Sequence, residues 1–411
     1  MAAEHGPDRW LTDYTLLALR TGRCAREAGA TALVDRYGVD DLAEQVEAEE
    51  APRAGRLAED AAGLAERLPS QGFDAHRSAF LGDQLAAVQA MAEQLDGAGR
   101  PLRELVRHCV GVEGAPVPES EFEAAHDLLD RALPGGAGPL ARRLDEWRTA
   151  HLLDDPAALP GLIERAAAET RRRTAALIGL PEEETEVRIV SGAAFHGAGS
   201  YQGGGRSVLY VNSDVPLNLA DLFHLVSHEG HPGHIAEGAL KEVHLVDGEG
   251  YAEQRVRFMP SPQFTVSEGI GLHAQSIAFP GDEAQRWLRD NVLAERGITA
   301  DGGDFAAIHG ARNRLWGAWA NASLLIDEGR PEDEALAYLA RWALLSEAEL
   351  DAARAVFSGP GGGPYIFAYH HGHRLLAEWL DAPDRPTRVR RLLTEQLRIT
   401  DLAPDTEEGT G

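Results

Sequence analysis

Helical spacing is the sequence feature that most constrains the fold of this chain. Over most of its length, apolar residues recur every three or four positions among charged residues, as in residues 75–95. That spacing is typical of amphipathic α-helices. Clusters of glycine and proline, such as residues 97–101, divide the pattern into separate segments. We therefore predict a mainly α-helical protein with many short connections.

One stretch departs from the helical pattern. Residues 187–190 and 207–212 are short β-type runs, and the glycine-rich residues 192–205 separate them. We predict two strands around a long flexible loop, and hence a small antiparallel β element. From residue 218 onward the helical pattern returns, and it predicts helices over residues 219–246, 264–279, 282–296, 305–328, 332–357 and 365–380.

Charge and composition exclude two classes of partner. The 66 acidic residues exceed the 39 Lys and Arg residues, so the net charge is 39 − 66 = −27. Such an excess argues against a nucleic-acid partner, because that affinity depends on cationic side chains. No apolar run approaches the roughly 20 residues of a membrane span. Residues 1–20 carry no signal-peptide pattern, and two cysteines make no disulfide framework, so we expect a cytoplasmic protein.

The histidines indicate the chemistry, because they are unevenly distributed. Residues 220–234 contain four of the 16 histidines together with Glu229. Zinc hydrolases commonly carry His-Glu-x-x-His on one helix, with the Glu acting on the water bound to the metal. Here His228 and Glu229 begin such a pattern, but Pro232 occupies the position of the second histidine. The alternatives are a histidine-rich surface patch or a set of core imidazoles with satisfied hydrogen bonds, although so dense a cluster favours a metal site.

Three histidines are candidates for the partner of His228. On a regular helix His234 would point about 120° away from it. Pro232 must interrupt the helix, however, and a two-residue bulge could return His234 to the same face. His224 is spaced i, i+4 from His228 without any interruption, and His231 lies one turn from His228. The spacing by itself leaves this choice open.

Two later segments could complete the site. Glu268 lies in an apolar helical segment, where a carboxylate is costly to bury unless it is paired or binds a metal. It is a candidate third ligand, and pairing with an arginine is the alternative. Near the C-terminus, Tyr369, His370 and His371 offer a phenol and imidazoles that could donate to an oxyanion, or could pack in the core.

These segments resemble the bacterial metallopeptidase-like family known as domain of unknown function 885, which is distantly similar to Taq-type zinc carboxypeptidases. The order and spacing of five motifs agree. The residues that carry the resemblance are 210–212, 228–234, 268–273, 327–329 and 369–372, and the chain departs from the family pattern at Ile235, Ile270, His273, Gln275 and Arg330.

The resemblance implies a zincin-like, multi-helix architecture with the β element at the active-site cleft. It also implies His228 and His234 as helix ligands, Glu268 as the third ligand and Glu229 as the general base. The expected metal is Zn²⁺, with Fe²⁺ as the alternative, because imidazole binds several transition metals. The predicted regions are helical residues 1–180, metal-binding catalytic residues 181–400 and a disordered tail, 401–411.

The leading functional hypothesis is zinc-dependent hydrolysis of an amide bond in a small peptide or peptide-like metabolite. Glu229 would act as the base, while Tyr369, His370 or His371 would stabilise the oxyanion and His231 would orient a ligand. One alternative is a zinc or iron enzyme that acts on a small non-peptide metabolite, such as an amidohydrolase or a lyase. Another is a non-catalytic helical protein that binds metal in a closed four-ligand site. The oligomeric state is not predicted.

Overall fold

The computed structural model describes residues 6–30, 33–358 and 362–402. The prediction of a mainly α-helical fold is confirmed, since helices make up most of these residues. The predicted tail, 401–411, lies outside the described residues from residue 403 onward. Asp401 and Leu402, in contrast, end a 3₁₀ turn in which Leu402 is buried. The chain forms two compact units, the first comprising Met1–Ala115, Leu240–Gly269 and Ser358–Gly411 and the second Pro116–Ala239 and Ile270–Phe357.

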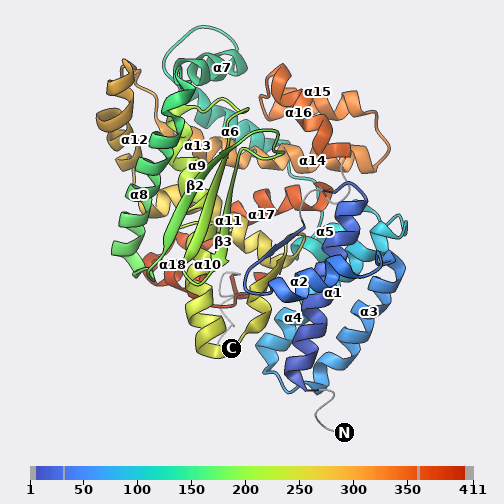
Figure 1. The fold of residues 1–411 in the computed structure, drawn as a ribbon. Helices are drawn as coiled ribbons and strands as arrows, with labels where there is room; N and C mark the ends of the chain where they lie inside the picture. Colours follow the sequence, from blue (N-terminus) through green and yellow to red (C-terminus); the bar gives the residue numbers. More distant parts are fainter. Residues whose placement is uncertain (1–5, 31–32, 359–361, 403–411) are drawn as a thin grey trace, which may run out of the picture. The chain divides into compact units, whose positions relative to one another are not determined.

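In its described residues, the first unit is helical apart from one short antiparallel ribbon, in which β1 (Val34–Arg36) pairs with β5 (Val256–Phe258). Trp10 is buried, and its indole N–H donates to the carbonyl of Leu64 at 3.0 Å, which ties two of the helices together. The helices of this unit are α1 (Pro7–Glu27), α2 (Asp40–Ala48), α3 (Ala54–Arg67), α4 (Ala75–Leu95), α5 (Leu102–Val110), α17 (Gly362–Leu380) and α18 (Arg385–Thr394) (Figure 1).

Helix α4 illustrates how local sequence forms these elements. Its bounds agree with the predicted residues 75–95. The Asp74 carboxylate caps the first turn by accepting from the amide of Arg77 at 2.9 Å, which satisfies an otherwise unpaired N–H. Apolar side chains such as Leu81 and Leu85 are buried along the helix. Gly97 follows the helix with φ 88°, a conformation that glycine adopts easily.

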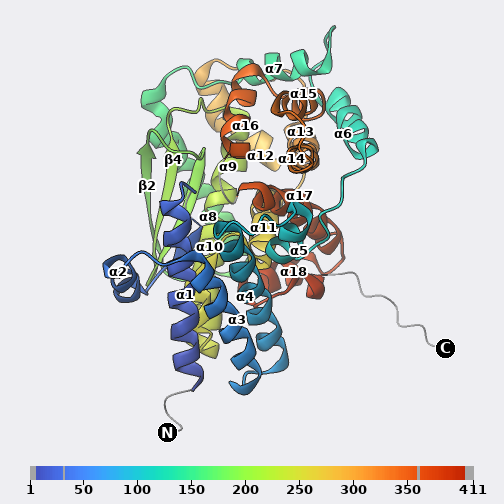
Figure 2. The same cartoon turned by 90° about the vertical axis from the view of Figure 1, so that its right-hand side faces the viewer.

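The second unit combines helices with a three-stranded sheet in the order β2 (Glu184–Val190), β4 (Arg206–Asn212), β3 (Gly197–Gly203). Helix α8 contacts β2, and α9 contacts β3 (Figures 1 and 2). The core includes Phe223 and Phe279, whose ring centroids are 4.2 Å apart. The helices of this unit are α6 (Glu119–Ala132), α7 (Leu140–Ala150), α8 (Leu159–Ile178), α9 (Leu222–Glu229), α12 (Glu283–Leu288), α13 (Phe305–Arg314), α14 (Trp316–Asp327), α15 (Glu332–Trp342) and α16 (Glu347–Ser358).

The sheet corrects the prediction for residues 187–212. The two predicted strands pair in parallel, with Glu184 opposite Arg206. The stretch predicted to be a flexible loop contains β3, which supplies the antiparallel pairing with β4. A Cβ on Gly199 would lie 1.9 Å from the carbonyl oxygen of Glu229, so glycine is needed here for close packing against α9. The glycine content of this stretch suggested flexibility, but at Gly199 it allows the backbones of β3 and α9 to lie close together.

Two predicted helices are interrupted without a local breaker. Predicted residues 332–357 form α15 and α16, and between them Leu344 has φ 55°, which no glycine or proline signals. Predicted residues 305–328 form α13 and α14.

The division between the units falls inside α10 (His234–Lys241) and α11 (Pro262–Ala278), each of which is continuous.

Short helical turns complete the described chain, and none of its helices is both long and apolar enough for a bilayer span. The 3₁₀ turns are Leu68–Ser70, Pro156–Ala158, Leu219–Asp221, Ala252–Arg255, Ala294–Arg296 and Ile399–Leu402, and the π-helical turns are Glu242–Asp247 and Arg289–Leu293.

Candidate metal centre

The interruption between α9 and α10 brings two histidines together. His228 lies in the last turn of α9 and His234 begins α10, and their ring centroids are 4.8 Å apart with the planes at 84°. The amide of Gly233 donates to the carbonyl of Ser227 at 3.0 Å. A Cβ on Gly233 would lie 1.8 Å from the carbonyl oxygen of His228. Glycine is therefore required at this position for the tight path that places the two rings side by side.

Glu229 is held in one orientation beside His228. Its Oε2 accepts a hydrogen bond of 2.8 Å from the amide of Gly199 in β3. Its Oε1 lies 3.9 Å from Nε2 of His228, and both side chains are largely buried. One carboxylate oxygen is thus fixed by the sheet while the other faces an imidazole nitrogen. Gly199 was not among the sequence candidates, because nothing local to β3 indicates its partner 30 residues away.

Helix α11 approaches the His228 ring through a glycine. A Cβ on Gly271 would lie 2.6 to 2.7 Å from three ring atoms of His228, so the bare backbone leaves room for the ring. Because α11 is continuous, Glu268 lies three residues and about one turn before Gly271 on the same side of the helix. His228, His234 and Glu268 form a group in the described chain that could hold a metal ion. Two imidazoles and a carboxylate are a donor set that suits catalytic zinc.

Glu268 is buried and receives a hydrogen bond from the hydroxyl of Tyr365 to its Oε1. Tyr365 was not a sequence candidate, although it precedes the predicted Tyr369 by one helical turn. The two phenol rings make an edge contact with centroids 5.6 Å apart. Tyr365 therefore orients the carboxylate that the sequence singled out.

Close contact between α11 and α17 explains the glycines of two motifs. A Cβ on Gly372 would lie 2.3 Å from the carbonyl oxygen of Thr265 and 2.8 Å from the amide nitrogen of Gly269. A Cβ on Gly269 would likewise lie 2.6 Å from the carbonyl oxygen of Gly372. The backbones of the two helices touch at this point, which neither motif by itself could indicate.

The predicted histidines of α17 are uncharged at neutral pH. Burial, with the neighbouring His371 and Arg374, lowers the pKa of His370 to about 3. Burial and Arg374 lower the pKa of His371 to about 4. Their ring centroids are 5.0 Å apart, and Nε2 of His371 is buried without a hydrogen-bond partner among the described residues. Neutral imidazoles of this kind can donate one N–H each.

His231 bonds to a distant carboxylate. Its Nε2 lies 2.8 Å from Oε2 of Glu183, whose other oxygen accepts from the hydroxyl of Ser207 in β4. Burial would raise the pKa of Glu183, but the bonds from His231 and Ser207 hold that pKa below its ordinary value. His231 thereby ties the segment between α9 and α10 to the sheet. Glu183 lay outside the sequence candidates.

His224 belongs to a second histidine cluster. Its ring stacks on His309 with centroids 5.0 Å apart, and Nε2 of His309 lies 2.7 Å from Oδ1 of Asp221. Asp221 also accepts from Arg312 at 2.8 Å. Burial alone would raise the pKa of Asp221, but Arg312 and His309 hold it well below its usual range. Burial and His309 hold the pKa of His224 well below its ordinary value.

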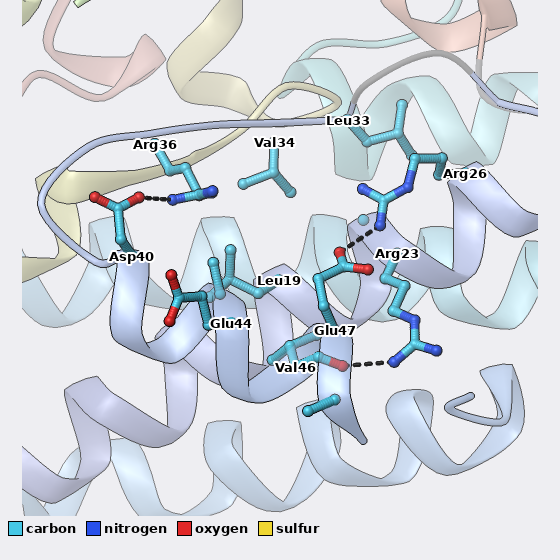
Figure 3. Close-up of a pocket in the computed structure, with 13 residues that line it drawn as sticks. Leu19, Arg23, Arg26, Leu33, Val34, Arg36, Asp40, Glu44, Val46 and Glu47 are labelled. Atoms are coloured by element: carbon cyan, nitrogen blue, oxygen red, sulfur yellow. Dashed lines mark hydrogen bonds and ion pairs between the residues drawn. The ribbon is translucent and has the colours of Figure 1, made fainter. Parts of the chain in front are cut away.

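A hollow of about 580 Å³ in the first unit contains none of the predicted site residues (Figure 3). Its walls carry charges that neutralise one another, since Arg26 pairs with Glu47 and Arg36 pairs with Asp40. Apolar side chains such as Val34 fill the space between these pairs (Figure 3). Four of the charged side chains that line the hollow are therefore paired with one another.

Comparisons with known proteins support a similarity of fold and do not show a function. No protein-family model matches this sequence, and no curated protein matches it. The structure is similar to the crystal structure of a presumed lipoprotein from Colwellia psychrerythraea, with a TM-score of 0.50 and 14% identity. The match covers 89% of this chain and 68% of that one. At this identity the similarity is one of fold alone.

An M32 carboxypeptidase from Deinococcus radiodurans R1 is a more remote neighbour. Its crystal structure matches with a TM-score of 0.39 and 14% identity, over 94% of this chain and 88% of that one. The similarity is too remote to support a conclusion about fold or function. Membership of the family known as domain of unknown function 885 stays a prediction from the sequence motifs.

Proposed function

We propose that this protein is a zinc-dependent hydrolase that cleaves an amide bond in a small peptide or peptide-like metabolite. The observation that supports the proposal best is the position of Glu229. One of its oxygens is bound by Gly199, and the other faces Nε2 of His228 at 3.9 Å. A base held beside a metal-binding histidine has a use in hydrolysis and none in a purely structural metal site.

The proposed metal ligands are His228, His234 and Glu268. When bound, zinc would lower the pKa of a coordinated water towards about 7 and polarise the carbonyl group of the amide. His228 and His234 are adjacent because of the interrupted helix. Tyr365 would keep Glu268 in one orientation through its hydrogen bond to Oε1. Iron remains the alternative metal, and the metal content of the purified protein distinguishes the two.

Glu229 would transfer the proton in this mechanism. Its Oε1 would take a proton from the attacking water while Oε2 stays bound to Gly199. The same oxygen would then deliver that proton to the leaving amine as the carbon–nitrogen bond breaks. The products would be a carboxylic acid, which receives the hydroxyl of the water, and an amine, which receives its proton.

The remaining predicted residues would have supporting roles. We propose that Tyr369, His370 or His371 donates to the developing oxyanion, for which neutral side chains are suitable at pH 7. We propose that His231 acts through Glu183, by holding the segment that joins the two ligand histidines. The cytoplasmic location and the absence of a nucleic-acid partner stay predictions from composition.

Glu229→Gln tests the proposed function. The assay is hydrolysis of a dipeptide and acyl-amino-acid library, combined with zinc and iron content by elemental analysis. We expect zinc in the wild type and in the variant, and a rate reduced about 10²- to 10⁴-fold in the variant. Glu249→Gln, at an exposed position, is the matched control and should leave the rate unchanged. Full turnover by zinc-loaded Glu229→Gln protein would refute the mechanism.

A further inference from the structure

The second unit contains a pocket of about 200 Å³ that the proposed mechanism does not use. We call it the Arg148–Arg312 pocket, after the two guanidinium groups that line it. Its other lining residues include His224, Trp316, Trp319 and Glu349.

The two arginines have hydrogen-bond donors to spare. Arg312 holds Asp221 through Nη1 alone, at 2.8 and 2.9 Å from the two carboxylate oxygens. Arg148 donates from Nη1 to Glu349 at 3.0 Å. Within the described residues, Nε and Nη2 of both arginines donate to no protein acceptor. The side chain of Arg312 is 29% exposed and that of Arg148 is 17% exposed, so these donors are partly shielded from solvent.

The charges of the two arginines also repel each other. Burial lowers the pKa of Arg148, and the positive charge of Arg312 lowers it further. Glu349 balances this only in part, because its side chain is 40% exposed and also accepts from the amide of Ser346. An anion between the two guanidinium groups would relieve the repulsion and use the spare donors. A carboxylate matches such a planar pair of donors best.

The apolar part of the lining indicates which kind of group the carboxylate would be attached to. Trp316 and Trp319 lie with ring centroids 5.7 Å apart, and both are half-buried. Leu315 and Leu345 also line the pocket. Indole faces and aliphatic side chains favour a small aromatic or apolar group over a hydrated ion. Inorganic phosphate alone would leave this surface uncovered.

The pocket lies close to the proposed catalytic residues. His224 lines it, and His228 follows His224 by four residues, one turn along α9. A ligand that contacts His224 would therefore lie about one helical turn from His228.

We propose that the Arg148–Arg312 pocket binds a carboxylate that is joined to a small aromatic or apolar group of the substrate. The substrate class would accordingly be amides that carry a carboxylate close to the scissile bond. This substrate class rests on the proposed function, whereas binding of a carboxylate in the pocket does not.

Calorimetric titration of the metal-free full-length protein with 3-phenylpropionate tests the pocket without any hydrolysis. Three further probes separate the parts of the ligand: 3-phenylpropanamide lacks the charge, acetate lacks the ring, and inorganic phosphate is a different anion. We expect saturable binding of 3-phenylpropionate and at least tenfold weaker binding of the other three. Absence of binding at millimolar concentration, or equal binding of phosphate or the amide, would overturn the proposal.

Variants locate the site. Arg148→Gln and Arg312→Gln should each weaken binding of 3-phenylpropionate at least tenfold. Arg314→Gln, an exposed position on the same helix as Arg312, should leave it unchanged. Arg148→Gln leaves Asp221 paired, so it tests the pocket even if Arg312→Gln fails to fold. Wild-type binding by folded Arg148→Gln protein would refute the assignment.

The two proposals fail in different ways. Binding of 3-phenylpropionate that depends on Arg148, in a protein that hydrolyses no amide, would refute the hydrolase and support the pocket. Zinc-dependent hydrolysis that makes no distinction between substrates with and without a carboxylate would support the hydrolase and overturn the pocket as its substrate site.

Discussion

Gly271→Ala tests whether the shape of α11 sets the position of the His228 ring. The added Cβ would lie 2.6 Å from Cε1 of His228 and 2.7 Å from both of its ring nitrogens. Ordinary contacts between such atoms are about 3.5 to 4.0 Å, so the ring or the helix must move by roughly 1 Å. The substitution therefore perturbs the proposed ligand directly and adds only one methyl group.

Gly271→Ala has two opposing effects on stability, one from overpacking and one from helix propensity, and they partly cancel. Overpacking of this kind costs about 1 to 3 kcal/mol, while replacing glycine by alanine inside a helix contributes about 1 kcal/mol. We expect the free energy of unfolding of the metal-free variant to fall by about 0 to 2 kcal/mol. Metal sites tolerate distance errors of only about 0.2 Å, so a ligand displaced by roughly 1 Å should weaken zinc binding about 10- to 100-fold.

Urea unfolding of the metal-free protein and competition with a chromophoric zinc chelator measure these two quantities. Gly310→Ala, in α13, is the matched control because no atom lies within 4 Å of the added Cβ. It should gain up to about 1 kcal/mol of stability and keep wild-type zinc affinity. Unchanged zinc affinity in Gly271→Ala protein would refute the argument that this glycine positions the ring.

Two further predictions concern the first unit. Gly372→Ala would place a Cβ 2.3 Å from the carbonyl of Thr265, so urea unfolding should show a loss of about 1 to 3 kcal/mol or more, and wild-type stability would contradict the close contact of α11 and α17. The pKa of His371 is about 4 when folded and about 6.5 when unfolded, so the unfolded state binds the extra proton and stability falls as the pH drops from 6.5 to 4. In His371→Gln protein the free energy of unfolding should depend less steeply on pH, by about 1.4 kcal/mol per unit in this range, and identical slopes would contradict the prediction.

The sequence predicted the helices where the signal is local. Helix α4 agrees with its predicted bounds because the apolar spacing lies within the segment and the Asp74 cap and Gly97 flank it closely. The break at Leu344 was missed, because it depends on a left-handed backbone that no local glycine or proline signals. Local spacing therefore predicts helices well and their tertiary interruptions poorly.

The glycine-rich stretch shows a different reason for failure. Composition alone cannot distinguish glycines that give flexibility from glycines that allow close packing. Gly199 is of the second kind, since it contacts the backbone of Glu229 and donates to its carboxylate. The close packing of β3 against α9 therefore depends on a residue 30 positions later in the chain, which the glycine content of the stretch does not indicate.

By itself, the sequence determined the mainly helical class and the residues that could bind a metal, because helical spacing and His-Glu motifs are local properties. The spacing left open whether His224, His231 or His234 lies beside His228, and the family resemblance implied His234. The tertiary structure decided this. His224 stacks on a histidine 85 positions away (309 − 224 = 85), and His231 bonds to a carboxylate 48 residues away. Of these three candidates, His234 lies against the His228 ring, because a glycine between them permits the tight turn. The distant partners of the other two leave no trace in the local spacing.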